Sequence, residues 1–133
     1  MKKNGMAFYM AAAHLVAYRQ PKCPSSSLLF NLHWVPIKYR INFKIATLTY
    51  KTLVSGQPGY LRNLLSTYRP TRSLRSQDNH LLTKPSVYTS IGRRAFSYAA
   101  PQIWNAITLN IRNSPSGSCF KRHLKTSYFA TAF

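Results

Sequence analysis

The chain has 133 residues, a length that suits one domain, and its apolar content of 45% is high enough to form a hydrophobic core. Nineteen lysines and arginines stand against a single acidic residue, Asp78, for a formal net charge of +18. This balance excludes a two-metal phosphoryl-transfer centre and a glycosidase site, because both need paired carboxylates. It favours a polyanionic partner, foremost RNA or DNA, or the rest of a larger protein that supplies acidic residues. An anionic membrane surface and an isolated fragment that does not fold are the alternatives.

The cysteine count and the apolar runs bear on location. Two cysteines, Cys23 and Cys119, are too few for a disulfide-stapled secreted domain, so a nuclear or cytoplasmic location is favoured over secretion. No apolar run reaches the roughly 18 residues of a membrane span. We therefore expect no transmembrane segment.

The first element in chain order is a predicted helix over residues 6–19, which is rich in alanine and methionine. Pro21 and Pro24 then end it. The basic start at Lys2 and Lys3 also resembles a targeting signal. Because basic residues follow the apolar stretch at once, an ordinary helix is the preferred interpretation.

The next element, a helix over residues 37–54, has the strongest pattern in the chain. Pro36 suits the first position of such a helix, where its missing N–H is not needed. Two apolar stripes run along it, one made of Ile37, Ile41, Ile45 and Leu48, the other of Tyr39, Phe43, Ala46, Tyr50 and Leu53. We expect it to be covered on two sides and to be the longest and most buried helix.

Shorter elements follow. Residues 56–59 have the composition of a turn, and residues 60–65 predict a short helix. Residues 69–79 are polar and basic and predict a loop. Residues 81–91 contain β-branched and aromatic residues around a proline, which favours a short extended ribbon.

Two helices are expected near the C-terminus. The first starts at Arg93, with Ala95, Phe96 and Ala99 facing inward. The second follows a break at residues 115–118 and carries Phe120, Leu124 and Tyr128 on one face.

The predicted fold class is therefore mainly α: a small irregular helical domain, with a short β ribbon around residues 81–91 as an option. Residues 1–24 form an N-terminal helix and a proline-rich link. Residues 25–133 form a single helical domain.

Catalytic and metal-binding patterns are weak. The histidines His14, His33, His80 and His123 lie in no recognisable motif, so we expect no catalytic residue. Cys119 and His123 are four residues apart and could share a helix face as zinc ligands, with Cys23 and His33 completing the set. A cysteine more commonly acts as a small buried hydrophobe. We expect no metal and no cofactor.

Basic residues interleaved with aromatic ones are the one chemical signal present. Arg69, Arg72 and Arg75 lie within seven residues, next to Tyr68. Arginine binds phosphate with two parallel hydrogen bonds, and tyrosine can stack on an unpaired base. We predict these arginines as the main nucleic-acid contact; the alternative is a solvated loop without specific role. The second predicted contact consists of Arg93 and Arg94, while Trp34, Phe96 and Trp104 are predicted to be core residues.

Several segments, in a fixed order, resemble one family. They are Leu32-His33-Trp34-Val35-Pro36, Pro58-Gly59-Tyr60-Leu61, Thr71-Arg72-Ser73-Leu74-Arg75-Ser76, Arg94-Ala95-Phe96-Ser97, Trp104-Asn105 and Phe120-Lys121. Together they are similar to the region downstream of the polymerase domain in non-LTR (LINE-type) retrotransposon reverse transcriptases, the mobile element jockey-like RNA-directed DNA polymerases. The resemblance covers about residues 11–133.

The resemblance implies a non-catalytic C-terminal segment of a reverse transcriptase, separated from the catalytic part. The family's catalytic aspartates lie upstream of this region, and this chain has no counterpart of them. The position of the region implies a role in holding template RNA or target DNA, without sequence specificity. The alternative is an inactive structural remnant of a degraded mobile element.

Overall fold

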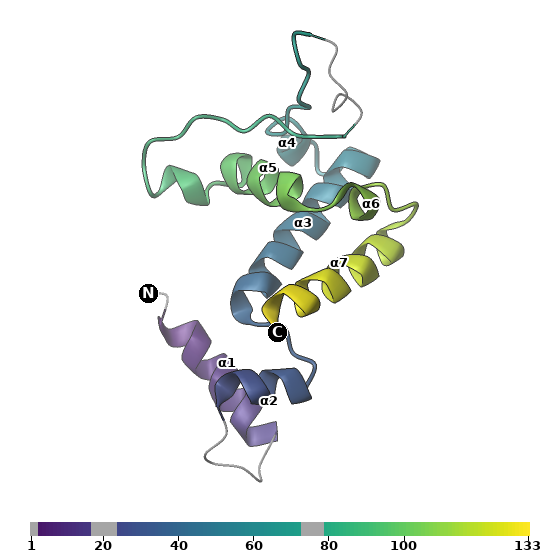
Figure 1. Ribbon diagram of the computed structural model, residues 1–133. Helices are drawn as coiled ribbons and strands as arrows, with labels where there is room; N and C mark the ends of the chain where they lie inside the picture. The colour runs from purple at the N-terminus through teal and green to yellow at the C-terminus, as the bar shows by residue number, and fades with distance from the viewer. Residues whose placement is uncertain (1–2, 17–23, 73–78) are drawn as a thin grey trace. The chain divides into compact units, whose positions relative to one another are not determined.

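The structure is a computed structural model that describes residues 3–16, 24–72 and 79–133 (Figure 1). Within these residues the chain is mainly helical, so the predicted fold class is confirmed. The helices are α1 (Lys3–Val16), α2 (Ser25–Asn31), α3 (Ile37–Ser55), α4 (Gly59–Arg62), a 3-10 turn η1 (Gly92–Arg94), α5 (Phe96–Ala106), α6 (Leu109–Arg112) and α7 (Gly117–Ala132).

The chain divides into two compact units. The first unit consists of Met1–Ile41 and Lys125–Phe133, and the second of Asn42–Leu124. The helices α3 and α7 contribute to both units. The expected division at residue 24 stays a prediction. No described helix is long and apolar enough to cross a membrane.

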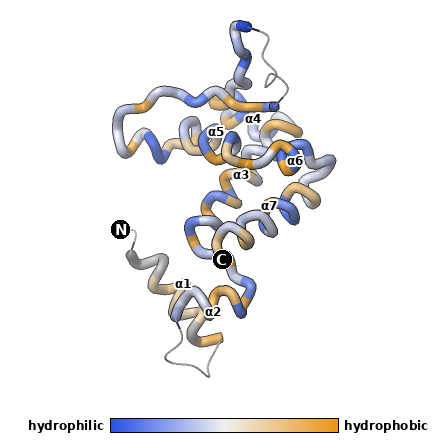
Figure 2. Tube along the Cα trace, viewed as in Figure 1, coloured by the Kyte–Doolittle hydropathy of each residue, from blue (hydrophilic) through white to orange (hydrophobic). Residues whose placement is uncertain are grey.

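Helix α3 is the longest of the described helices and carries more buried residues than any of the others, as predicted. Figure 2 shows hydrophobic and hydrophilic residues alternating along it. The expected cover on two sides is wrong, because Ile41 is 54% exposed and Leu48 is also exposed. Two threonines occupy the buried face instead, and their hydroxyls donate to carbonyls four residues earlier: Thr49 Oγ1 to Ile45 and Thr52 Oγ1 to Leu48, both at 2.8 Å.

A left-handed glycine ends α3. Gly56 has a φ of 69° and its N–H donates to the carbonyl of Thr52 at 3.0 Å. A residue without a Cβ adopts this conformation at little cost, which is why glycine commonly follows the last turn of a helix. The predicted short helix after this point is present as α4, but it begins at Gly59, inside the predicted turn, and ends at Arg62 rather than at residue 65.

Three aromatic rings from three helices form the core of the second unit. The ring of Phe120 on α7 is 0% exposed and stacks on Tyr50 of α3 with 4.4 Å between centroids and on Trp104 of α5 with 5.9 Å. The Tyr50 hydroxyl donates to the carbonyl of Ser114 at 2.8 Å, so its polar end is satisfied. Trp104 is 3% exposed, which confirms it as a core residue.

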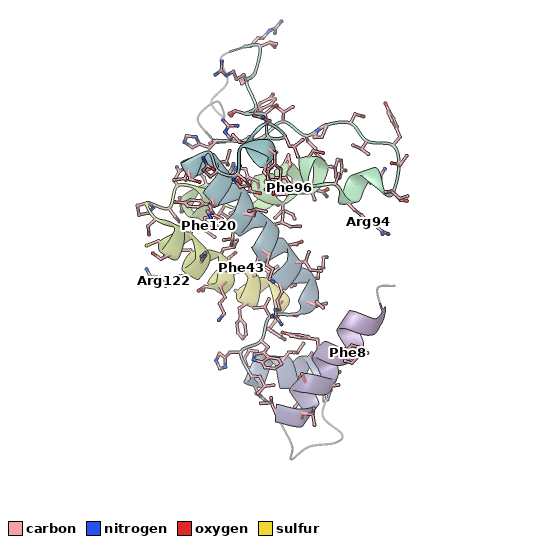
Figure 3. The ribbon with its side chains drawn as sticks, turned by 180° about the vertical axis from the view of Figure 1, so that it is seen from behind. Phe8, Phe43, Arg94, Phe96, Phe120 and Arg122 are labelled. Carbon is pink, nitrogen blue, oxygen red and sulfur yellow. The ribbon has the colours of Figure 1, made fainter. Side chains whose placement is uncertain are left out.

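The other two aromatic residues predicted for the core, Trp34 and Phe96, are only half-buried. Figure 3 labels Phe96 on α5. Phe96 is the first residue of α5, where the helix has just begun, so its ring is not enclosed by neighbouring turns. Ala95, expected to face inward, is exposed in the extended N-cap position. The helix thus begins later than predicted, and Arg93 belongs to η1 rather than to α5.

The optional ribbon over residues 81–91 is reduced to one isolated antiparallel bridge, between Thr67 and Leu82, among the described residues. The backbone N–H of Tyr68 donates to Leu81 at 2.8 Å, and that of Thr83 donates to Ser66 at 2.7 Å. Pro85 lacks an N–H and so cannot extend this ladder further along the chain.

The first unit is held by aromatic contacts of its own. Tyr9 of α1 stacks on Trp34 with 5.5 Å between centroids, and its hydroxyl donates to the carbonyl of Val35 at 2.8 Å. The guanidinium of Arg40 lies over the same tyrosine ring at 4.9 Å. A second cluster joins Phe30 to Phe129 and Phe133.

Candidate nucleic-acid interface

The described start of the arginine-rich segment predicted to bind nucleic acid, residues 68–72, is called the arginine loop below. It begins at the bridge between Thr67 and Leu82. Asn105 of α5 holds the other side of that bridge: its Oδ1 accepts from the Leu82 N–H at 2.9 Å and its Nδ2 donates to the Leu82 carbonyl at 2.8 Å. One amide side chain therefore satisfies both backbone groups of a buried residue.

Two more side chains hold the segment just before Leu82. Trp104 Nε1 donates to the carbonyl of His80 at 2.8 Å, and Arg112 Nη1 donates to the carbonyl of Asn79. His80 has a φ of 48°, a left-handed conformation that few residues other than glycine adopt. Residues 79–82, called the anchored segment below, are thus tied to α5 and α6 by side-chain hydrogen bonds.

These anchors were not found from the sequence. The sequence identifies Trp104 as a core residue and Trp104-Asn105 as part of a family motif, but it does not indicate which residues the pair contacts. The partners lie more than 20 residues earlier in the chain and contribute backbone atoms only. Backbone atoms are the same in every residue, so such a bond has no sequence signature.

The predicted site arginines fall into two separate groups within the second unit. Arg69 and Arg72 are exposed on the arginine loop, next to the exposed Tyr68. Arg93 and Arg94 are exposed on η1, which follows the extended stretch of residues 83–91. This turn lies away from residues 69–72 (Figures 1 and 3). Arg75 lies outside the described residues. The described arginines do not form one compact patch.

None of these four guanidinium groups is hydrogen-bonded or ion-paired to another described residue. The chain has one acidic side chain, Asp78, and it lies outside the described residues. Carboxylate side chains are therefore absent from the described part, and its cations have no acidic side chain as partner there. Exposed and unpaired guanidiniums can bind phosphate without first breaking an internal contact.

A cavity of about 310 Å³ lies beside the anchored segment, within the second unit. Its polar lining includes Arg62, Arg112 and His80, and its apolar lining includes Leu53, Val54 and Trp104. Arg62 Nη1 donates to the carbonyl of Leu65 at 3.0 Å, which holds its side chain in place.

Arg112, like Arg62, is partly buried. Burial lowers the pKa of its guanidinium below the ordinary arginine value. Its Nε is buried and has no hydrogen-bond partner among the described residues. This partly desolvated cation thus has no countercharge among the described residues, an arrangement that costs free energy unless an anion compensates it.

The residues considered for zinc do not form a site in the described part of the chain. No group of three or more histidine, cysteine or acidic side chains comes together among those residues. Cys119 is half-buried and His123 is exposed, and both lie on α7. Cys23 lies outside the described residues.

Comparisons with known proteins returned no match. No protein-family model matches the chain, and neither a curated protein nor a solved structure is significantly similar to it. The reverse-transcriptase resemblance thus rests on the ordered sequence motifs alone.

Proposed function

We propose that this chain is a non-catalytic basic segment of a non-LTR retrotransposon reverse transcriptase that binds RNA or single-stranded DNA without sequence specificity. The observation that carries the proposal is the pair of exposed guanidiniums, those of Arg69 and Arg72, that have no partner among the described residues. They follow a bridge whose other side, residues 79–82, is tied to the helical core. The formal net charge of +18 supplies the long-range attraction to a polyanion.

The chemistry of binding follows from the residue types. Arg69 and Arg72 would contact phosphate oxygens, which are the same in every nucleotide. The exposed ring of Tyr68 would stack on an unpaired base, a contact that tolerates any base because each has a π face. Neither contact reads base identity, so the binding would be independent of sequence.

The anchored segment would lower the cost of this binding. Hydrogen bonds from Asn105, Trp104 and Arg112 hold residues 79–82 before any ligand arrives. Less ordering is then needed on association, so more of the contact free energy appears as affinity.

The absence of polymerase activity is part of the proposal. A single acidic side chain cannot hold two catalytic cations. Purified protein should extend no primer on an RNA template with Mg²⁺ or Mn²⁺. Incorporation of nucleotides that survives the substitution Asp78→Asn would contradict this part of the proposal.

The binding itself is tested by its salt dependence. If about four to six cations engage a single strand, the slope of log affinity against log salt should be roughly −3 to −4, because each contact contributes about −0.7. Fluorescence anisotropy with single strands of unrelated sequence measures both the slope and the tolerance of sequence. If no strand binds near physiological salt, the proposal fails and the alternative, an inactive remnant of a degraded mobile element, is favoured.

A matched pair of double variants tests the location. Arg69→Ala/Arg72→Ala removes two exposed cations of the arginine loop, and Lys44→Ala/Lys51→Ala removes two exposed cations of α3. The loop variant should flatten the slope by roughly 1 to 2 units and the α3 variant by less, because each lost phosphate contact removes about 0.7. Equal changes would mean that the loop is only part of a diffuse positive field.

A further inference from the structure

The cavity beside the anchored segment combines two features that the arginine loop lacks, a concave shape and an apolar wall. Arg62 and Arg112 line the same space as Val54 and Trp104. Ligand sites in proteins commonly have mostly apolar walls and a few polar groups that fix the orientation of the ligand. The cavity therefore differs in kind from the exposed phosphate contacts of the loop.

The charge of the cavity points to an anion. Both arginines are partly buried, each spends one donor on a backbone carbonyl, and neither has an acidic partner among the described residues. A guanidinium has five N–H donors, so most of the donors of Arg62 and Arg112 remain for a ligand. Arginine recognises phosphate and carboxylate through paired donors, and phosphate is the one of these that the proposed nucleic-acid ligand carries.

The size and the wall of the cavity point to more than a phosphate ion. Its volume of about 310 Å³ lies at the lower end of the range found for small-molecule sites, about 300–1,000 Å³. Leu53, Val54 and Trp104 offer apolar surface that a bare phosphate would not use. A flat heteroaromatic base joined to a phosphate through a sugar matches both parts of the lining.

We propose that this cavity binds a nucleoside 5′-monophosphate, either free or as the phosphorylated 5′ end of a single strand. Its phosphate is held by Arg62 and Arg112, and its base lies against the apolar wall. The inference rests on the proposed nucleic-acid function and adds a distinct site to it, next to the arginine loop.

The geometry is already held in the unliganded protein. Trp104 is fixed by its bond to His80, and Arg112 by its bond to Asn79. The same bonds tie the cavity wall to the anchored segment. A nucleotide in the cavity would therefore lie beside the anchored segment.

The test uses isothermal titration calorimetry of the full chain at about 0.15 M salt, where screening limits diffuse attraction to about 8 Å. The probes are adenosine 5′-monophosphate, adenosine and inorganic phosphate. We expect the monophosphate to bind at least about tenfold more tightly than the other two, because charge-assisted bonds and apolar burial each contribute on that order. Inorganic phosphate binding as tightly as the monophosphate would overturn the assignment of a nucleotide.

Two variants show whether the binding occurs in the cavity. Val54 is 70% exposed and lines the cavity, so Val54→Trp should occlude it while keeping the core and every charge. Its matched control is Leu48→Trp, an exposed position on the same helix outside the cavity. The monophosphate should bind Val54→Trp at least about tenfold more weakly and Leu48→Trp unchanged. Equal affinity for both variants would overturn the proposal.

Arg62→Gln provides a second test of the phosphate assignment, because it removes one guanidinium that would bind the phosphate and leaves the aromatic rings of the core unchanged. It should weaken the monophosphate by roughly tenfold while leaving adenosine unaffected. An equal loss for both ligands would mean that the arginine only maintains the fold, and the phosphate assignment would be wrong.

Strands with and without a 5′-phosphate separate the two sources of the nucleotide and the two proposals. A 5′-phosphorylated strand that binds more tightly than its 5′-hydroxyl counterpart, with the gain lost in Val54→Trp, identifies the strand end as a ligand. If the two strands bind equally tightly and only the free monophosphate binds Val54→Trp more weakly, the ligand is a free nucleotide. If strands bind but neither a 5′-phosphate, nor the monophosphate, nor Val54→Trp changes their affinity, the cavity site is refuted and the proposed function stands. If no strand binds, the proposed function itself is refuted.

Discussion

Aromatic rings meet in both units, but they are buried to different degrees. In the second unit, Phe120 is fully enclosed and stacks on Tyr50 and Trp104. In the first unit, Phe30 and Phe133 contact each other at 5.4 Å, yet they remain 49% and 44% exposed. The ring contacts are similar in the two clusters. Any difference in how much each cluster contributes to the free energy of unfolding should therefore come from the apolar surface that it removes from water.

The buried cluster also has a second role that the exposed one lacks. Trp104 packs on Phe120 with its ring face and donates from its Nε1 to the anchored segment. The side chain of Trp104 thus links the core of the second unit to the anchored segment. Changes in this core should affect nucleic-acid binding, while changes in the exposed cluster should not.

The largest expected effect is that of Trp104→Ala. Loss of a buried ring typically costs about 3–5 kcal/mol, a large part of the 5–15 kcal/mol by which small domains are stable. The matched change Phe30→Ala should cost less, because half of that ring is already in water. Urea unfolding of both variants measures the difference.

The opposite outcome would be informative. If Trp104→Ala leaves the unfolding curve unchanged but weakens RNA binding, the ring is a base-stacking platform, and its assignment to the core is wrong.

A smaller effect is expected from Asn105→Ala, which removes both side-chain bonds to Leu82. Leaving these buried backbone groups unpaired should cost about 1–3 kcal/mol in the free energy of unfolding. Hydrogen exchange at the amides of Tyr68 and Thr83, which pair across the bridge, should become faster. Asn110→Ala, at an exposed position, serves as control; exchange that stays slow at both amides in Asn105→Ala would show that the anchor is dispensable.

The smallest effect concerns alkaline pH and the first unit. Burial, with a contribution from Tyr39, raises the pKa of Tyr128 to about 12, above its ordinary value of 10.0. The folded protein thus retains the phenol proton that the unfolded chain loses above pH 10, so stability falls as pH rises from about 10 to about 12. Tyr128→Phe cannot ionise and should lose less stability over this interval.

Chemical denaturation at several pH values between 9 and about 12 follows this difference. Tyr88→Phe, at a fully solvated ring, should behave as the parent chain does. Parallel stability curves for the parent chain and Tyr128→Phe would contradict the assignment of the pKa shift to Tyr128.

Helix α3 and its end could be predicted because both are local. Apolar spacing marked the helix, and Gly56 marked its end. The same spacing included Ile41 and Leu48 in an apolar stripe, although both are exposed, and it left Thr49 and Thr52, which are buried, out of both stripes. A threonine becomes a core residue once its hydroxyl bonds to its own helix, and apolar periodicity does not show this.

The candidate site also has a part that is local in sequence and could be predicted, and a part that depends on tertiary packing and could not. The arginines were visible as a cluster in the sequence, but the separation of Arg93 and Arg94 from the arginine loop was not. The cavity depends on Arg62, Arg112 and Trp104, which come from three helices and share no local pattern. Tertiary packing alone brings them together.

Photo-crosslinking tests the central claim most directly. A single-stranded RNA that carries 4-thiouridine is irradiated with the full chain near physiological salt, and the crosslinked peptides are identified by mass spectrometry. The account predicts adducts concentrated on the arginine loop, at Tyr68 and its neighbours, and lost in Arg69→Ala/Arg72→Ala but not in Lys44→Ala/Lys51→Ala. Adducts spread evenly over the basic faces of α3 and α7, and unchanged in the loop variant, would contradict it.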